Sequence, residues 1–180
     1  MHKSTLKRAA IMGAMVAALV AVPIQGATAE TASPELAHCA IQIFPIGETD
    51  HEPAEEACFA TEAEVAAFLA GESEPGEGSR AAAANVVVGT VYKDAGGAGA
   101  SLAFYGASGC AGTSYGFPTV AETWAGSISS VRAANSCWST AYASASYAGS
   151  RVSCTPYCAT LGGLNDSVRS LVFRPVGSAG

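Results

Sequence analysis

The sequence predicts an all-β fold for residues 85–180, preceded by a small disulfide-stapled segment with a strand, a loop and a helix. Three observations support this prediction. Short β-prone runs recur between Gly-containing turns, long helical patterns are absent, and residues 85–180 contain an internal repeat. A chain of 180 residues has room for one modest domain and a small appendage, which excludes a large enzyme.

The charges divide the chain into regions of different character. The whole chain carries 9 Lys plus Arg and 15 Asp plus Glu, a net charge of −6. Residues 30–79 contain twelve of the carboxylates and no Lys or Arg, whereas residues 80–180 contain three acidic and six basic side chains. Neither region is basic enough for a nucleic-acid groove, so we expect no nucleic-acid partner.

Residues 1–29 are typical of a secretory signal peptide. Lys and Arg at positions 3, 7 and 8 form a positive start, and Ile11–Val22 is an apolar run too short to span a bilayer. Ala27–Ala29 supplies the small residues that a signal peptidase requires. A membrane anchor is disfavoured by Pro23 and by this cleavage site. We therefore expect a secreted, extracellular protein with no membrane association after cleavage.

The acidic segment, residues 30–70, is expected to hold one strand and one helix. Cys39–Phe44 is a strand candidate that stops at Pro45, and Thr61–Glu64 forms a capping box that opens a helix ending near Gly71. The segment can be interpreted as a pro-region or as an intramolecular cover of the following domain. Residues 71–84 have the composition of a linker.

Cysteine usage predicts disulfides, because all six cysteines lie in the exported part of the chain. Six cysteines allow many pairings. If the acidic segment folds separately, its two cysteines pair with each other. The most economical pairing of the other four then joins Cys110 to Cys137 and Cys154 to Cys158. Zinc ligation is the weaker alternative, because His38 and His51 are the only histidines after the signal peptide. The cysteines are Cys39, Cys58, Cys110, Cys137, Cys154 and Cys158.

The domain of residues 85–180 is expected to contain strands at 86–92, 101–105, 127–132, 138–142, 151–154 and 168–173. Its internal repeat has two parts. Tyr92 and Gly99 recur as Tyr142 and Gly149 at an offset of 50, and residues 124–130 align with 164–170 at an offset of 40. The domain thus contains two copies of one structural unit, and a loop in the second copy is shorter. An aromatic residue, a sharply turning glycine and a polar loop before the last strand suit a four-stranded Greek key.

These residues resemble the βγ-crystallin double Greek-key domain found in secreted bacterial proteins, including the I36 family of peptidase inhibitors. The family's hairpin motif is an aromatic residue, four residues, an aromatic residue, any residue and glycine. Tyr142, Tyr147 and Gly149 satisfy it fully, whereas the first copy carries Gly97 in place of the second aromatic residue. The resemblance covers about residues 85–176. It implies a βγ-crystallin-like double Greek-key sandwich.

The resemblance also implies a calcium loop of the pattern Asn/Asp, Asn/Asp, two variable residues, Ser/Thr, Ser. Asn165 and Asp166 of one loop with Ser129 of the other would supply one degenerate site, whereas Arg169 places a positive charge where the second ion would bind. The alternative is an Asx-type turn before the last strand. We expect weak Ca²⁺ binding at most and no other cofactor.

No catalytic residues are predicted. Gly112–Gly116 fits the nucleophile elbow G-x-S-x-G, but that elbow requires a later histidine and none follows His51. Without a base, Ser114 is an ordinary serine in a glycine-rich loop. Residues 106–121 are either a recognition loop or a plain connection, and the aromatic residues of the domain are expected in the core rather than on a ligand platform.

The leading functional hypothesis is a secreted, monomeric, non-enzymatic binding protein. The resemblance to the I36 inhibitors implies an extracellular peptidase as its partner, blocked by a rigid loop near Cys110 or by the clip Cys154–Cys158. The first alternative is a structural or weakly calcium-binding extracellular protein. The second is a toxin-like module on the same fold.

Overall fold

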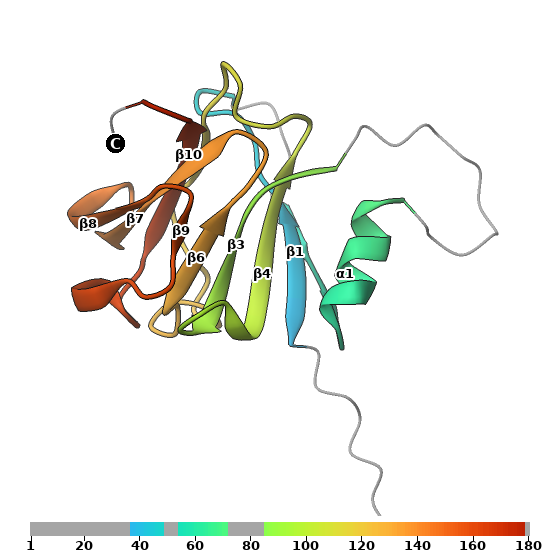
Figure 1. Ribbon diagram of the computed structural model, residues 1–180, viewed down its shortest axis with the longest axis horizontal. Coiled ribbons are helices and arrows are strands. Elements are labelled where there is room, and N and C mark those ends of the chain that lie inside the picture. Colours follow the sequence, from blue (N-terminus) through green and yellow to red (C-terminus); the bar gives the residue numbers. More distant parts are fainter. Residues whose placement is uncertain (1–36, 49–53, 72–84, 179–180) are drawn as a thin grey trace, which may run out of the picture. The chain divides into compact units, whose positions relative to one another are not determined.

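The computed structural model describes residues 37–48, 54–71 and 85–178 (Figure 1). The expected signal peptide and nearly all of the expected linker lie outside this part of the chain. No helix of the described part is long and apolar enough to cross a membrane. In chain order the elements are β1 (His38–Gln42), β2 (Glu56–Phe59), α1 (Glu62–Leu69), β3 (Val86–Asp94), β4 (Ala98–Gly106), β5 (Tyr115–Phe117), β6 (Ser130–Ala133), β7 (Cys137–Ser144), β8 (Ala148–Cys154), β9 (Tyr157–Cys158), the 3-10 turn η1 (Gly162–Leu164) and β10 (Ser170–Pro175).

The described strands form a six-stranded sheet in the order β2-β1-β4-β3-β6-β9 and a four-stranded sheet in the order β5-β10-β7-β8. Strands β3 to β6 make up the first copy of the repeat, and β7 to β10 make up the second. In each copy the third strand crosses to the other sheet, so that β5 pairs with β10 and β9 pairs with β6. The two copies are interlocked Greek keys, and the predicted all-β double Greek-key fold is confirmed.

All six strands expected in residues 85–180 are present, with bounds shifted by a few residues. Strands β5 and β9 were missed because they are three and two residues long, too short to show an alternating pattern. The sandwich core lies between the sheets. Its largest fully buried apolar side chains include Phe104 of β4 and Phe173 of β10, whose ring centroids are 5.3 Å apart.

A buried serine closes each copy of the repeat. In the first copy the Ser130 hydroxyl donates to the Asp94 carbonyl (2.7 Å) and accepts from the Gly97 N–H (3.0 Å). In the second copy the Ser170 hydroxyl donates to the Ser144 carbonyl (2.7 Å) and the Tyr147 N–H donates to it (2.9 Å). Each serine thus fastens the hairpin of its copy to the strand that completes the Greek key.

The missing aromatic residue of the first hairpin is replaced by side chains from elsewhere. In the second copy Tyr147 meets Tyr142 edge-on, with centroids 6.0 Å apart. In the first copy, a Cβ placed on Gly97 would lie 3.5 Å from the Tyr157 hydroxyl and 3.7 Å from the Arg132 guanidinium. Arg132 stacks 4.2 Å above the Tyr157 ring. A cation–π pair therefore fills the position that the family motif assigns to an aromatic side chain.

The acidic segment is built into the six-stranded sheet. Strand β1 pairs in parallel with β4, in register from His38↔Ser101 to Gln42↔Tyr105, and β2 pairs antiparallel with β1. Helix α1 begins with the predicted capping box at Thr61 and packs its buried Val65 against this extension of the sheet. Figure 1 shows α1 beside β1. The described parts of the acidic segment and of the β region form one compact unit.

The three disulfides are Cys39–Cys58, Cys110–Cys137 and Cys154–Cys158. This is the chain-order pairing that the sequence favours as most economical. Cys39–Cys58 joins β1 to β2, where the two residues are directly opposite each other. A second link holds the same segment to the domain, because the Trp124 indole N–H donates to the Glu56 carboxylate at 2.7 Å.

Gly89→Ala tests the packing between the sheets. A Cβ at Gly89 would collide with the Phe173 ring and lie 3.0 Å from the Arg132 carbonyl. We expect the free energy of unfolding to fall by about 1–3 kcal/mol in urea titration. Gly163→Ala is the matched control, because that position has open space around it, and it should change stability by less than about 0.5 kcal/mol. Equal stability of the two variants would contradict this packing.

Candidate binding surface

The predicted calcium residues are partly brought together. The Ser129 hydroxyl donates to the Asp166 carboxylate at 2.9 Å across the two loops. Asn165 is directed elsewhere, because its side-chain oxygen accepts from the Leu161 N–H at 2.8 Å and from the Thr160 hydroxyl at 3.2 Å. The Asn165 side chain therefore closes its own loop by bonding an N–H four residues earlier in the chain, whereas an Asx turn bonds an N–H two residues later.

The donor set fits a calcium ion poorly. Ca²⁺ takes about six to eight oxygen ligands. Here the carboxylate of Asp166 and the hydroxyl of Ser129 satisfy each other. At the pseudo-equivalent position, Gly126 offers no side chain, and the Arg169 guanidinium lies 3.7 Å from where its Cβ would stand. A guanidinium in that place opposes a dication.

A histidine and a serine meet at a place that the sequence did not indicate. His38 Nδ1 lies 2.8 Å from the Ser101 hydroxyl and 3.9 Å from the Glu62 carboxylate. In a serine hydrolase the serine and the acid contact opposite ring nitrogens. Here Ser101 and Glu62 both contact Nδ1, and Ser101 is 3% exposed. The geometry therefore suits a structural contact that connects β1, β4 and α1. The pair arises from the parallel pairing of β1 and β4, which sequence patterns do not reveal.

One further group of potential metal ligands consists of Cys39, Glu56 and Cys58. Its two sulfur atoms are bonded to each other, and the Glu56 carboxylate accepts the Trp124 indole N–H. The group therefore serves the attachment of β2 to the sandwich.

A short turn, Pro45–Glu48, crosses one end of the sandwich. The Ile43 N–H donates to the Tyr105 carbonyl of one sheet at 2.8 Å, and the Ile46 N–H donates to the Ser114 carbonyl next to the other sheet at 2.8 Å. The Glu48 N–H closes the turn on the Pro45 carbonyl, with φ of 102° at Gly47. Because the turn is fastened at both sides, its backbone bridges the two sheets.

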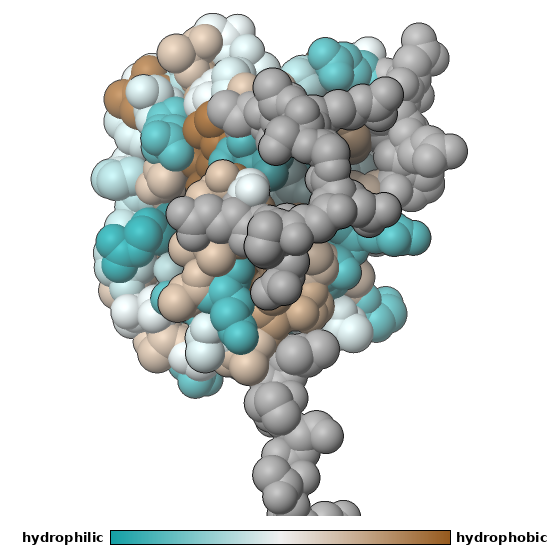
Figure 2. Space-filling model, turned by 90° about the vertical axis from the view of Figure 1, so that its right-hand side faces the viewer, coloured by the Kyte–Doolittle hydropathy of each residue, from teal (hydrophilic) through white to brown (hydrophobic). Residues whose placement is uncertain are grey.

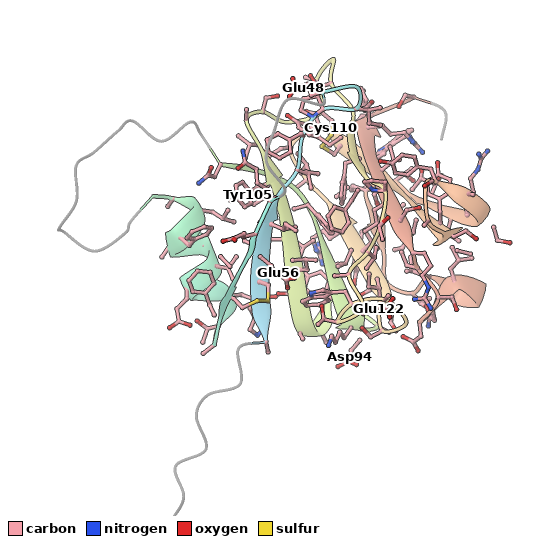
Figure 3. All side chains as sticks on the ribbon, turned by 180° about the vertical axis from the view of Figure 1, so that it is seen from behind. Glu48, Glu56, Asp94, Tyr105, Cys110 and Glu122 are labelled. Carbon is pink, nitrogen blue, oxygen red and sulfur yellow. A yellow bond between two sulfur atoms is a disulfide. The ribbon has the colours of Figure 1, made fainter. Side chains whose placement is uncertain are left out.

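The loop of residues 107–114 lies at the same end, where Figure 3 labels both Glu48 and Cys110. Its middle is fixed by the Cys110–Cys137 disulfide and by the Cys110 N–H, which donates to the Asn135 carbonyl at 3.0 Å. Its base is fixed by the Tyr115 hydroxyl, which donates to the Ser108 carbonyl at 2.8 Å. The loop is therefore anchored at several points, while Ala111 and Gly112 remain exposed.

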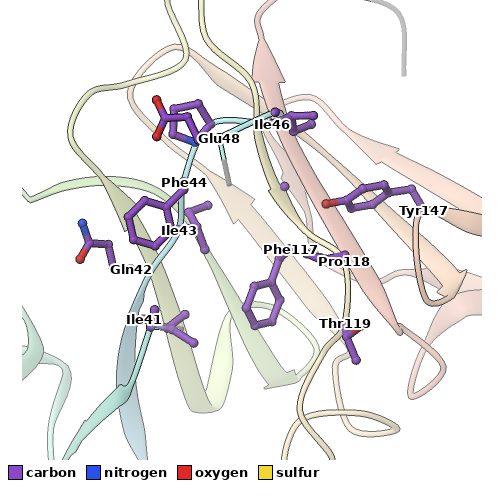
Figure 4. A pocket seen from close by; sticks show the side chains of 14 residues that line it. Ile41, Gln42, Ile43, Phe44, Ile46, Glu48, Phe117, Pro118, Thr119 and Tyr147 are labelled. Atoms are coloured by element: carbon purple, nitrogen blue, oxygen red, sulfur yellow. The ribbon is translucent and has the colours of Figure 1, made fainter. Parts of the chain in front are cut away.

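An apolar groove of about 620 Å³ lies beside the turn (Figure 4). One wall is formed by residues 41–48 and the other by residues 116–119 with Tyr147, and Glu48 is the one charged residue among the described residues of the lining. Burial raises the pKa of Tyr147, and the neighbouring Tyr142 raises it further, so the phenol stays neutral.

The side of the molecule that carries α1 differs from this apolar groove, because Figure 2 shows hydrophilic and apolar residues interspersed there.

The clip Cys154–Cys158 is integrated into the sheet. Tyr157 and Cys158 form β9, and the Pro156 carbonyl accepts from the Ala133 N–H at 2.8 Å. The Tyr157 ring is covered by Arg132. The tip of the clip, Thr155 and Pro156, is exposed but only two residues long, so loop 107–114 is the longer of the two loops that the sequence suggests for recognition.

The comparisons with known proteins concern the fold. No protein-family model matches the chain, and no curated protein matches it significantly. Four solved chains are similar, among them the following three. The N-terminal domain of protein S is 21% identical, with 49% of this chain and 96% of that domain aligned at a TM-score of 0.38. A βγ-crystallin domain from Flavobacterium johnsoniae is 21% identical, with 51% and 99% aligned at 0.36. A domain described under the evolution of the eye lens βγ-crystallin domain fold is 14% identical, with 57% of this chain and 94% of that chain aligned at a TM-score of 0.41.

Calcium should leave the stability of the protein unchanged. A site with a millimolar dissociation constant would stabilise the protein by about 1.4 kcal/mol in about 10 mM Ca²⁺, which would raise the melting temperature by several degrees. We expect no resolved shift in a thermal melt, because Asp166 already holds Ser129. The matched variant is Asp166→Asn, since asparagine tolerates the φ of 56° at this position. A calcium-dependent rise that Asp166→Asn abolishes would overturn this expectation.

Proposed function

We propose that the chain is an exported, non-enzymatic binding protein that inhibits an extracellular peptidase. The observation that carries this proposal is the end of the sandwich that displays loop 107–114 beside the turn Pro45–Glu48. Both are exposed at their tips. The disulfide Cys110–Cys137 fixes the middle of the loop, and hydrogen bonds fix the base of the loop and both sides of the turn.

Rigidity is the property that a peptidase inhibitor requires. A loop that is already ordered loses little conformational entropy on binding, so more of the contact free energy appears as affinity. The Tyr115 hydroxyl makes three polar contacts to Ser108, which hold the start of the loop against a fully buried ring. These contacts support a preformed binding surface.

The export assumed in this proposal is supported by the signal-like residues 1–29 and by three disulfides, which persist in oxidising compartments. A structural, weakly calcium-binding role is the second candidate. It is favoured by the proximity of Asp166 and Ser129 across the two loops, although their mutual hydrogen bond has to break before either group can hold an ion.

Inhibition can be measured directly on a panel of secreted serine, cysteine and metallopeptidases. We expect at least one peptidase to be inhibited at or below about micromolar concentrations of the processed protein. Protein denatured and reduced before the assay is the control, because its loops are no longer preformed. If no peptidase is slowed, the inhibitor proposal is wrong, and a calcium-dependent melt would then support the structural role.

The loop can be tested by loosening it. Tyr115→Phe removes the contacts to Ser108 and should cost about 1–2 kcal/mol of stability while weakening inhibition about tenfold. The double variant Cys110→Ala with Cys137→Ala should weaken inhibition further. The matched control is Cys154→Ala with Cys158→Ala, because this disulfide closes the clip. Inhibition constants and melting temperatures should be measured together, and equal loss in both disulfide variants would count against loop 107–114.

A further inference from the structure

Loop 107–114 lacks a side chain that could serve as an anchor. It consists of Ala, Ser, Gly, Cys, Ala, Gly, Thr and Ser, and its cysteine is buried in a disulfide. Protein interfaces derive most of their binding free energy from a few large side chains that fill pockets on the partner. A binding surface centred on this loop therefore needs an anchor from a neighbouring element.

Ile46 is placed to be that anchor. Among the described residues, only Ile46 and Val176 are large apolar residues that are strongly exposed, at 54% and 56%. Ile46 is the residue after Pro45 in the turn, and its N–H donates to the carbonyl of Ser114, the last residue of the loop. A hydrogen bond thus couples the exposed side chain directly to loop 107–114.

The surroundings of Ile46 are apolar and fixed. Its side chain lies against Gly116, which provides room for it. The adjoining groove is lined by apolar residues that include Phe117 and Pro118, and in the part of the chain that the structure describes Glu48 is its single charged residue (Figure 4). Ile46 is therefore part of a continuous apolar patch, in contrast to the single exposed apolar residues that are common on protein surfaces.

We propose that Ile46 inserts into an apolar side-chain pocket of the inhibited peptidase and sets the specificity of the inhibitor. This inference rests on the proposed function. An aliphatic side chain is accepted by a pocket lined with apolar groups, whereas a pocket with a carboxylate at its base would leave that charge buried and unpaired. The partner is thus a peptidase that cleaves next to apolar residues.

The experiment compares inhibition constants of the full processed protein and its variants against peptidases with apolar pockets and peptidases with acidic pockets. Ile46→Ala should weaken inhibition of the apolar-pocket enzymes by at least about 30-fold, the effect of a hot-spot residue. Val176→Ala is the control with matched exposure and should change inhibition by less than about threefold. Because both side chains are exposed, both variants should keep the melting temperature of the parent protein.

Ile46→Arg provides a gain of function that a loss of folding could not imitate. An arginine at the anchor can pair with a carboxylate at the base of an acidic pocket. We expect inhibition to shift from the apolar-pocket to the acidic-pocket enzymes, with the ratio of the two inhibition constants changing by at least about 100-fold.

The outcomes separate this inference from the function on which it rests. If the parent protein inhibits but Ile46→Ala and Ile46→Arg behave like the parent, Ile46 is not the anchor, and the proposed inhibition stands. If Val176→Ala is the variant that loses inhibition, the anchor lies elsewhere and the inference is wrong. If the parent protein inhibits no peptidase, both the inhibition and the anchor are overturned.

Discussion

The sandwich depends on the hydrogen bonds made by the hydroxyl groups of Ser130 and Ser170. Each one bonds a carbonyl and an N–H of the hairpin in its own copy, and both serines are fully buried. A buried polar group without a partner costs about 1–3 kcal/mol, so the serine and the folded hairpin require each other. Ser130 stands opposite Tyr92 and Ser170 stands opposite Tyr142 in the strand pairing. The same contacts thereby fix the register of the strand that completes each Greek key, and with it which side chains enter the core.

The acidic segment completes what the two Greek keys leave open. It covers the outer edge of β4 with β1 and then continues through Ile43 to Ile46, where it reaches the other sheet. The Cys39–Cys58 disulfide and the contact of Glu56 with Trp124 hold it there. A segment that the composition sets apart as an acidic leader is, in its described part, a structural support for the end of the sandwich. The proposed binding surface therefore depends on both regions of the chain.

Features with a local signature were predictable, whereas those created by distant pairing were not. The repeated Tyr and Gly positions predict the hairpins, and Thr61 with Glu64 predicts the helix start, because each pattern lies within a few residues. The contact of His38 with Ser101 joins residues 63 positions apart through a parallel strand pair, so no spacing announces it. Arg174 was also missed. Its side chain is buried and donates hydrogen bonds to the hydroxyls of Thr140 and Ser153 and to the carbonyl of Ser178. Nothing in the sequence around these three residues indicates such a group. The exposure of Ile46 likewise follows from where the chain crosses between the sheets.

The shorter loop of the second repeat has a consequence for stoichiometry. In the first copy, β4 and β5 are joined by loop 107–114, with its free tip. In the second copy, the equivalent connection between β8 and β9 is reduced to Thr155 and Pro156 and closed by the clip Cys154–Cys158. A protein built from two equal copies would present the same surface twice, related by its internal two-fold axis. The shorter connection of the second copy leaves a single long loop of this kind, so under the proposed function one molecule would hold one partner in one orientation.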